Sequence, residues 1–470
     1  MTPNVSLICE KCGCSYPITS LHSSCQKCSG TLEYIWDKNY LKKIVFTGEL
    51  SFWRYKMVLP VVSHQLSLGE GGTPLQKAQR LSDYLGLKEL YLKDETRNPT
   101  NSYKDRVAAL IVSDALGKGF SSLVSATNGN QGASLAAYSA KADLECHLVV
   151  PQHMDFGKLA QMMAYDAHII ESGDNIEDSI EKAVILEKEM SWYQATTELN
   201  PLSLEAIKTI SYEIIEQRGL PDWVVLAMGS GVTTASLWKG FKELKCAGKI
   251  DSLPKLIGVQ AEGCAPISQA FKSGSNEVIP TKKSDTEAIA ISVMNPIYGN
   301  LALDAIKESD GLAVTVTDTE MLQSGREIAR LEGIFPEPAS ASTVACLDLL
   351  KRTSAIDAND RIICIITSSG LKTDDILQSI SKRRKSLGLG SMLTTKEKIL
   401  RLFSNEDTYG YEIWKSLGKG MTIGAVYQHI SDLEKRGLIT SNLKGKRRYF
   451  QITDRGRKAL EAMDVLQALL

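Results

Sequence analysis

The chain has 470 residues, of which 43% are hydrophobic and 23% charged, and its formal net charge is −1. This composition excludes a disordered or fibrous protein, and at about 150 residues per domain the length suggests about three units. No apolar run of about 18 residues predicts a transmembrane helix and no signal peptide is evident, so we expect a cytoplasmic protein without a membrane partner. The charge is uneven, because residues 391–470 carry 14 basic and 9 acidic side chains.

The first 35 residues are rich in cysteine. Two CxxC pairs, Cys9 with Cys12 and Cys25 with Cys28, present four thiols that can surround a zinc ion tetrahedrally. A segment this short cannot build a core without a cross-link, and disulfides are disfavoured in a reducing compartment. We therefore predict a zinc ribbon over residues 1–35 that holds a structural Zn²⁺. Cys14 is a fifth thiol that competes with Cys12 for one ligand position.

Between residues 66 and 382, short apolar runs alternate with amphipathic helical patterns. The runs predict buried strands at residues 89–92, 122–125, 147–150, 224–227, 256–259 and 362–366. Helical patterns lie between them, for example at residues 104–118, 132–142 and 176–190. This alternation predicts an α/β fold with parallel sheets that are covered on both faces.

Three glycine-rich turns lie in the same region, at residues 69–75, 126–132 and 228–234. The second and third turns stand between a predicted strand and a predicted helix, an arrangement that presents backbone N–H groups to an anion. Lys104 opens the helix predicted at residues 104–118. No P-loop and no dinucleotide-binding fingerprint is present. The residues alone thus indicate an anion site and a lysine without naming the ligand.

Seven motifs in this region occur in the order of a known family. They are GEGGTPL (69–75), NPTNSYKDR (98–106), GKLAQ (157–161), KT (208–209), GVQAEGCAP (258–266), EGIFPEPASA (332–341) and TSSGLK (367–372). Residues 66–375 thereby resemble the threonine synthase family within the fold-type II pyridoxal-phosphate enzymes, whose archaeal-type members also begin with a zinc ribbon. The resemblance implies a catalytic domain over residues 36–382 that uses pyridoxal 5′-phosphate to convert O-phosphohomoserine and water into L-threonine and phosphate.

The resemblance also implies cofactor-binding roles. Lys104 lies where the family lysine forms a Schiff base with the cofactor and then shuttles protons. Asn130 matches the asparagine at the cofactor's 3′-oxygen, and Thr367 matches the hydroxyl that faces the pyridine nitrogen. The loop that holds the 5′-phosphate corresponds to Gly229, Ser230, Gly231, Val232 and Thr233.

Substrate contacts are implied for a second set of residues. Thr127, Asn128 and Gln131 lie in the turn that should meet the substrate carboxylate. The substrate phosphate requires cations or N–H donors. Lys158 and Lys208 are candidates for this charge, although each also fits an exposed lysine on a helix face.

The sequence departs from the family pattern near this substrate site. Glu198 and Ser203 stand where many members have serine or asparagine and, further on, arginine. A related enzyme of the cysteate synthase or threonine dehydratase type therefore remains an alternative. A transcription regulator that retains the pyridoxal-phosphate fold is another, although Lys104 and the glycine-rich loop favour an enzyme.

A basic, glycine-containing stretch follows the core, and we interpret residues 383–393 as a linker. Residues 394–470 then show helical patterns at 394–405, 409–417 and 422–436, a hairpin with a basic tip over 438–452, and a last helix from 453. Three helices and a basic hairpin predict a winged helix-turn-helix, and the motifs of this region resemble the PadR-type regulators.

In such a domain the helix at residues 422–436 enters the DNA major groove. Tyr427, Gln428 and His429 would then lie near bases, and the hairpin would meet phosphates. The candidate phosphate contacts are Lys444, Lys446, Arg447 and Arg448. The alternative is a regulatory or oligomerisation domain with a solvated hairpin. Because winged helices of this type usually pair, we expect a homodimer.

Overall fold

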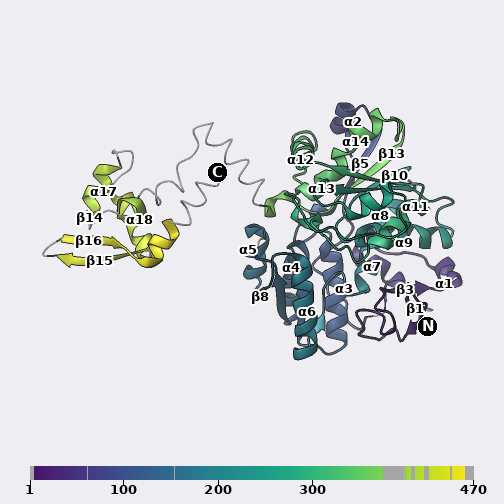
Figure 1. The fold of residues 1–470 in the computed structure, drawn as a ribbon, viewed down its shortest axis with the longest axis horizontal. Helices are drawn as coiled ribbons and strands as arrows, with labels where there is room; N and C mark the ends of the chain where they lie inside the picture. Colours follow the sequence, from purple (N-terminus) through teal and green to yellow (C-terminus); the bar gives the residue numbers. More distant parts are fainter. Residues whose placement is uncertain are drawn as a thin grey trace. The chain divides into compact units, whose positions relative to one another are not determined.

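The computed structural model describes residues 5–60, 62–152, 154–373, 396, 399–403, 408–417, 423–444 and 447–460. The chain divides into two compact units, residues 1–377 and 378–470 (Figure 1). The predicted linker at 383–393 lies outside the described residues, so its boundaries remain predictions. Among the helices of the described ranges, none has the length and apolar character that crossing a membrane requires.

The larger sheet of the first unit has the strand order β12-β11-β10-β13-β5-β4. Its strands are β4 (Leu75–Lys77), β5 (Glu89–Asp94), β10 (Trp223–Ala227), β11 (Lys255–Ala261), β12 (Leu312–Val316) and β13 (Arg361–Ile366). All neighbours are parallel except β4, which pairs antiparallel with β5. Every residue of β10 is buried, as expected for a parallel strand covered on both faces.

The smaller sheet has the order β8-β7-β6-β9. Its strands are β6 (Ser122–Ala126), β7 (Glu145–Val150), β8 (His168–Glu171) and β9 (Tyr193–Gln194), and all pairs are parallel. The two parallel sheets confirm the predicted α/β fold class, and all six predicted strands are present.

Helices surround both sheets. Figure 1 shows α3 (Lys104–Gly117), α4 (Asn130–Ala142), α5 (Phe156–Ala164) and α6 (Ile176–Met190) grouped around the smaller sheet. The other helices are α2 (Gln79–Leu85), α7 (Leu202–Ile207), α8 (Thr209–Arg218), α9 (Val232–Cys246), α10 (Pro266–Lys272), α11 (Gly299–Glu308), α12 (Asp318–Glu332), α13 (Pro338–Ala345) and α14 (Leu347–Arg352). Short 3₁₀ turns are η1 (Phe52–Val58), η2 (Glu95–Arg97), η3 (Ile289–Ile291) and η4 (Gly370–Lys372).

Local sequence signals set several of these helix starts. A capping box between Thr317 and Glu320 begins α12, because each side chain satisfies a backbone N–H that the first turn leaves unpaired. Helix α3 begins at Lys104 as predicted. Helix α4 begins at Asn130, two residues before the predicted start, so Asn130 lies in its first turn.

The cysteine-rich segment forms a small antiparallel sheet with the order β2-β1-β3. Its elements are β1 (Val5–Cys9), β2 (Ser15–Tyr16) and β3 (Leu32–Trp36), and α1 (Lys38–Lys43) follows. Leu7 and Leu32 are buried and belong to the main core of the first unit. The indole N–H of Trp36 donates to the Glu205 carboxylate at 2.9 Å. The cysteine-rich segment therefore packs against the rest of the first unit and does not form a separate body.

The second unit contains a three-stranded sheet with the order β14-β16-β15. Its elements are β14 (Thr408–Tyr409), α17 (Gly410–Ser416), α18 (Ile423–Lys435), β15 (Ile439–Lys444) and β16 (Arg447–Ile452), and residues 399–402 and 454–460 are helical. Gly437 follows α18 with φ +68°, the left-handed conformation that ends many helices. This arrangement confirms the predicted winged helix. Residues 461–470, the remainder of the last predicted helix, lie outside the described residues.

Candidate active site

One pocket of the first unit lies where three parallel strands end. Thr127 and Asn128 follow β6, Gly229 and Ser230 follow β10, and Thr367 follows β13, and all five residues line the pocket. Ligands of open α/β sheets bind at the carboxyl ends of the strands, where the loops leave room and backbone N–H groups point outward.

The pocket brings together most of the residues singled out from the sequence. Its lining includes Lys104, Thr127, Asn128, Asn130, Gln131, Gly229, Ser230, Gly231, Val232, Thr233 and Thr367. The loop after β10 and the turn after β6 come from different sheets, so the pocket lies between them. These residues belong to motifs that are far apart in the sequence, and the fold brings them together around one pocket.

Lys104 is half-buried at the start of α3. Its Nζ donates to Thr197 Oγ1 at 3.4 Å and lies 5.1 Å from the centre of the Tyr103 ring. The Tyr103 hydroxyl lies 2.9 Å from Thr233 Oγ1, which joins the lysine segment to the loop after β10. Lys104 forms no ion pair with any described residue, so its amine is accessible for a reaction in the pocket.

The loop after β10 is shaped to receive a phosphate. Gly231 has φ +87°, and a Cβ there would lie 2.6 Å from the carbonyl oxygen of Tyr298, so only glycine fits. Helix α9 starts directly afterwards at Val232. The N–H groups of a first helical turn have no partner within the helix, and the helix dipole favours an anion at this end. The loop therefore fits the 5′-phosphate of pyridoxal phosphate.

Two polar side chains line the pocket, Asn130 from the first turn of α4 and Thr367 from the segment after β13. The Asn130 Nδ2 donates to both carboxylate oxygens of Glu337 at 3.0 Å, and its Oδ1 accepts from Ser368 Oγ at 3.1 Å. The Thr367 hydroxyl lies 2.7 Å from Ser340 Oγ. An amide, a hydroxyl, an accessible amine and a phosphate loop together match the polar groups of pyridoxal phosphate.

Gln131 is the most distinctive polar group of the pocket. Its side chain is 95% buried, since only 5% is exposed, and within the described part of the chain neither amide atom has a hydrogen-bond partner. Burying an unpartnered amide is costly, so a ligand that pairs with it is expected. Thr127, by contrast, accepts the backbone N–H groups of Gly129 and Gly132 at 3.0 Å and holds the turn itself.

The two lysines predicted at the substrate phosphate lie elsewhere. Lys158 is buried, and its Nζ lies 2.6 Å from Asp155 and 3.4 Å from Glu337. Burial lowers its pKa, but these carboxylates outweigh that effect and raise the pKa. Lys208 is also buried, with its Nζ 2.6 Å from Glu205, and it does not line the pocket. Neither is an exposed helix-face lysine, and Lys208 is corrected to a residue of the core.

The pocket is instead acidic. Glu177, Glu198 and Glu337 line it, whereas Lys104 is the only lysine or arginine in its lining among the residues the structure describes. Sequence reasoning did not single out Glu337 or Thr197 as site residues. The motif EGIFPEPASA (332–341) contains Glu337 and is the sequence signal by which it could have been found.

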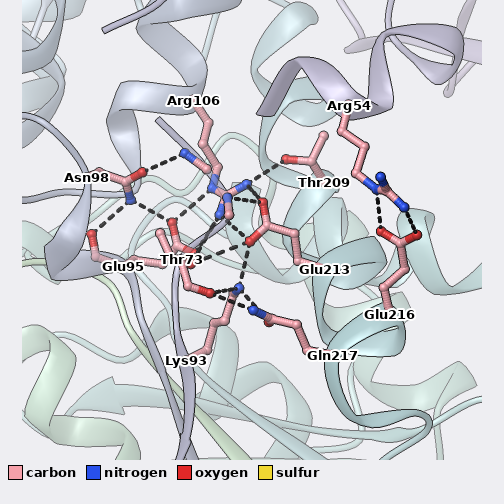
Figure 2. A network of polar contacts seen from close by, with 12 residues as sticks. Arg54, Thr73, Lys93, Glu95, Asn98, Arg106, Thr209, Glu213, Glu216 and Gln217 are labelled. Carbon is pink, nitrogen blue, oxygen red and sulfur yellow. Dashed lines mark hydrogen bonds and ion pairs between the residues drawn. The ribbon is translucent and has the colours of Figure 1, made fainter. Parts of the chain in front are cut away.

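A buried ionic network holds the start of α3 (Figure 2). Two residues after the pocket lysine, Arg106 donates to Glu95 at 2.8 Å and to Glu213 at 2.9 Å, and all three side chains are fully buried. Lys93 also contacts Glu213 at 2.6 Å. The backbone N–H of Gly72 donates to Glu213 at 2.9 Å, so the glycine-rich turn at residues 69–75 joins this network and not the pocket.

The four cysteines of the two CxxC pairs form one cluster. The Sγ atoms of Cys9, Cys12, Cys25 and Cys28 all lie within 4.8 Å of one another. Four sulfur ligands at about 2.3 Å from a zinc ion lie about 3.8 Å from one another, and the Cys9–Cys28 and Cys12–Cys25 sulfur atoms are 3.6 Å and 3.5 Å apart. A Cβ at Gly30 would lie 3.0 Å from the Cys9 Sγ, so the knuckle needs glycine there. Cys14 is not part of the cluster, and the thiols present fit a structural zinc ion.

The candidate DNA contacts lie on α18 and the hairpin of the second unit. Tyr427 and Gln428 are exposed on α18, and His429 is half-buried. Arg448 is held by Glu434 at 3.0 Å and by Ser441 at 2.8 Å. The backbones of Lys444 and Arg447 pair across the hairpin, and Lys446 lies outside the described residues.

Comparisons with known proteins define the class. Residues 66–368 match the family of pyridoxal-phosphate dependent enzymes, and residues 399–462 match the transcriptional regulator PadR-like family. Maize serine racemase has a similar fold with a TM-score of 0.56 at 19% identity, covering 67% of this chain and 93% of that chain. A threonine deaminase from Solanum lycopersicum has a TM-score of 0.57 at 18% identity, covering 73% and 92%. The fold and the pocket are those of a fold-type II pyridoxal-phosphate dependent enzyme.

The most informative relatives are curated proteins. Threonine synthase of Methanocaldococcus jannaschii is 42% identical over 377 residues, which cover 78% of this chain and 93% of that protein. Threonine synthase of Methanosarcina acetivorans is 39% identical over 372 residues, which cover 78% and 92%. The chain therefore belongs to the threonine synthase family.

Proposed function

We propose that this protein converts O-phosphohomoserine and water into L-threonine and inorganic phosphate, with pyridoxal phosphate bound in the pocket. The observation that carries the proposal is the convergence of Lys104, Asn130, Thr367 and the loop at residues 229–233 on one pocket. The relatives named threonine synthase support the same activity.

Each group of the pocket has a place in this function. The loop at residues 229–233 would hold the cofactor phosphate, Asn130 the 3′-oxygen, Thr367 the pyridine nitrogen and Lys104 the carbonyl carbon. Pyridoxal phosphate, when bound, supplies an electron sink that stabilises negative charge on the substrate carbon next to it. The protein's own task is to bind, orient and move protons around that centre.

Lys104 is the residue suited to moving protons. Among the residues that the structure describes, its Nζ has the Thr197 hydroxyl as its one hydrogen-bond partner, at a long 3.4 Å. An amine on a flexible side chain, held in a half-buried pocket, takes up and returns protons to neighbouring carbon atoms. Gln131, whose buried amide lacks a partner in the described structure, would donate to the substrate carboxylate, and its unpartnered amide supports this role.

A second candidate is an enzyme of the threonine dehydratase or cysteate synthase type. The charge of the pocket favours the threonine dehydratase type, whose substrate carries no phosphate, because Glu177 and Glu198 line the pocket while Lys158 pairs with Asp155. Two carboxylates oppose a substrate phosphate unless backbone N–H groups outweigh them.

A comparison of substrates separates the two candidates. The purified protein is incubated with pyridoxal phosphate and either O-phosphohomoserine, phosphoserine with sulfite, or L-threonine. Phosphate and threonine from O-phosphohomoserine support the first proposal. 2-Oxobutanoate from L-threonine, or a sulfonate product from phosphoserine, without turnover of O-phosphohomoserine, supports the second.

We also propose that Cys9, Cys12, Cys25 and Cys28 bind a structural Zn²⁺. Four thiolates leave no position for a reactive water, so the ion would stabilise the fold without entering the chemistry. No cysteine forms a disulfide among the described residues, which is usual in a reducing compartment, and we propose that the protein is cytoplasmic.

For the winged helix we propose DNA binding by a homodimer. The match to PadR-like regulators and the exposed Tyr427 and Gln428 on α18 support a groove contact. Arg448 already pairs with Glu434, which should reduce its contribution to phosphate binding. Retention of DNA should weaken as the salt concentration rises. Retention that is unchanged after removal of residues 391–470 would contradict the proposal, as would a monomeric mass in solution for the dimer.

A further inference from the structure

We propose that Glu337 and Lys158 form a positioning pair that fixes the amide of Asn130 so that it presents an N–H group to the cofactor oxygen. The inference rests on the proposed binding of pyridoxal phosphate in the pocket. It concerns residues of this chain that are not themselves assigned a contact with the cofactor, and it gives Lys158 a role other than substrate binding.

The contacts of Asn130 leave one orientation for its amide. The two ends of an asparagine amide have the same shape, but one end only accepts and the other only donates hydrogen bonds. The ionised Glu337 carboxylate only accepts, and both of its oxygens lie 3.0 Å from Nδ2. The Ser368 hydroxyl donates to Oδ1 at 3.1 Å from the other side. A carboxylate at residue 337 thus holds the NH₂ end of the amide in place.

This orientation has a direct consequence for the pocket. An amide NH₂ group carries two hydrogens, and one of them suffices for the shared contact with the Glu337 carboxylate. The second hydrogen remains for a ligand in the pocket that Asn130 lines. If the amide were reversed, a carbonyl oxygen would face the oxygen of the cofactor, and the two acceptors would repel each other.

The backbone ties Glu337 to the same ring of contacts. Its N–H donates to the carbonyl oxygen of Ser368 at 3.1 Å, and its carbonyl accepts from Ala341 at 3.0 Å as α13 begins. Within that helix Ser340 contacts the Thr367 hydroxyl at 2.7 Å. The start of α13 therefore contacts both Asn130 and Thr367, the two side chains that are expected to form hydrogen bonds with the cofactor ring.

Lys158 compensates the charge that this arrangement buries. Its Nζ lies 3.4 Å from Glu337 and 2.6 Å from Asp155, and its side chain is 1% exposed. The Lys158 side chain packs directly against Gly129. A Cβ at residue 129 would lie 2.2 Å from the Lys158 Cδ, so a larger residue there would displace the lysine. A buried carboxylate without a partner would tend to take up a proton, and it would then no longer be an acceptor only.

The test is a double-mutant cycle on cofactor affinity in the full-length protein. Pyridoxal phosphate is titrated into the wild type, Glu337→Gln, Asn130→Ala and the double variant, and binding is followed by the visible absorption band. Losing a hydrogen bond to a charged group weakens binding by about 10- to 100-fold. We expect Glu337→Gln to lose affinity in this range in the wild-type background, and by less than about 2-fold when Asn130 is already alanine.

Two further variants keep the result interpretable. Glu187→Gln is a matched control, because Glu187 also accepts from an amide, that of Gln194 at 2.8 Å, but does not line the pocket; its affinity should equal that of the wild type. Lys158→Met tests the pair without changing Glu337 and should also lose affinity only when Asn130 is present. An equal loss in both backgrounds, or no loss for Glu337→Gln, would overturn the proposal. Because only cofactor binding is measured, this failure is distinct from a failure to make threonine.

Discussion

Two basic residues in the first turn of α3 have opposite surroundings. Arg106 is fully buried and donates to Glu95, Glu213 and Thr209 (Figure 2). Lys104, two residues earlier, is half-buried, and in the described part of the chain its Nζ has one long hydrogen bond, to Thr197 at 3.4 Å. One cation is compensated entirely within the protein, and the other is left accessible to a ligand.

In this fold, stabilising residues and reactive residues therefore differ in how fully their polar groups are paired. A charge that is fully paired in the core cannot react, but its contacts hold strand β5, the turn at residues 69–75 and helix α8 against α3. A group that is to react must be short of partners, as Lys104 and Gln131 are in the described structure. Substitutions on the two sides should therefore affect different measurements.

The largest effect is expected for Lys104→Ala. The amine that moves protons is lost, and general acid–base catalysis alone contributes about 100- to 10,000-fold to a rate. We expect at least a loss of this size in turnover, together with loss of the visible absorption band of bound cofactor. The free energy of unfolding should stay within about 0.5 kcal/mol of the wild-type value, because Lys104 has no ion pair to lose in the described structure. Retention of the same band would contradict the assigned role.

Arg106→Met should show the reverse pattern. Removing one member of a buried ionic network leaves Glu95 and Glu213 without compensation, which costs about 3–5 kcal/mol of stability. Chemical denaturation measures this loss. The control Arg330→Met removes an exposed pair with Glu327 and should cost less than about 1 kcal/mol. Equal stability of the two variants would contradict the structural role of the network.

The network also predicts how stability depends on pH. Burial raises the pKa of Glu213, but the charges of Arg106 and Lys93 outweigh it and lower the pKa to about 2. Because the folded-state pKa lies below the unfolded value, this stabilisation is complete above about pH 4.5 and is lost as the pH falls toward 2. The contribution is about 3 kcal/mol. Glu213→Gln should be less stable at pH 7 and should lose less stability between pH 6 and pH 3 than the wild type. An unchanged dependence of the free energy of unfolding on pH would contradict this role of Glu213.

The smallest effect in this series is expected at the cysteine cluster. Cys9→Ser should abolish zinc binding and cost about 2 kcal/mol, because Cys9 is buried in the main core as well as in the cluster. Cys14→Ser should retain one zinc ion per chain, since Cys14 lies outside the cluster. Metal analysis and thermal melting check both. Loss of zinc in Cys14→Ser with retention in Cys12→Ser would reverse the ligand assignment.

The sequence predicted the scaffold of the pocket well. All six strands were identifiable because continuous apolar runs bounded by turns are typical of parallel strands, and the motif order placed Lys104, Asn130 and Thr367 in one site. Long polar side chains were harder to place. Glu337 lies 207 residues from Asn130 in the chain, so their contact exists only in the folded protein. Lys208 was misplaced because burial beside Glu205 leaves no periodic signal in the sequence.

We propose above that the protein converts O-phosphohomoserine into L-threonine in the pocket around Lys104. The most direct measurement follows inorganic phosphate and L-threonine together in one reaction of the purified protein with pyridoxal phosphate and O-phosphohomoserine. We expect the two products to appear in equal amounts, and neither to appear with Lys104→Ala. Full occupancy by the cofactor with no phosphate release at millimolar substrate would contradict it.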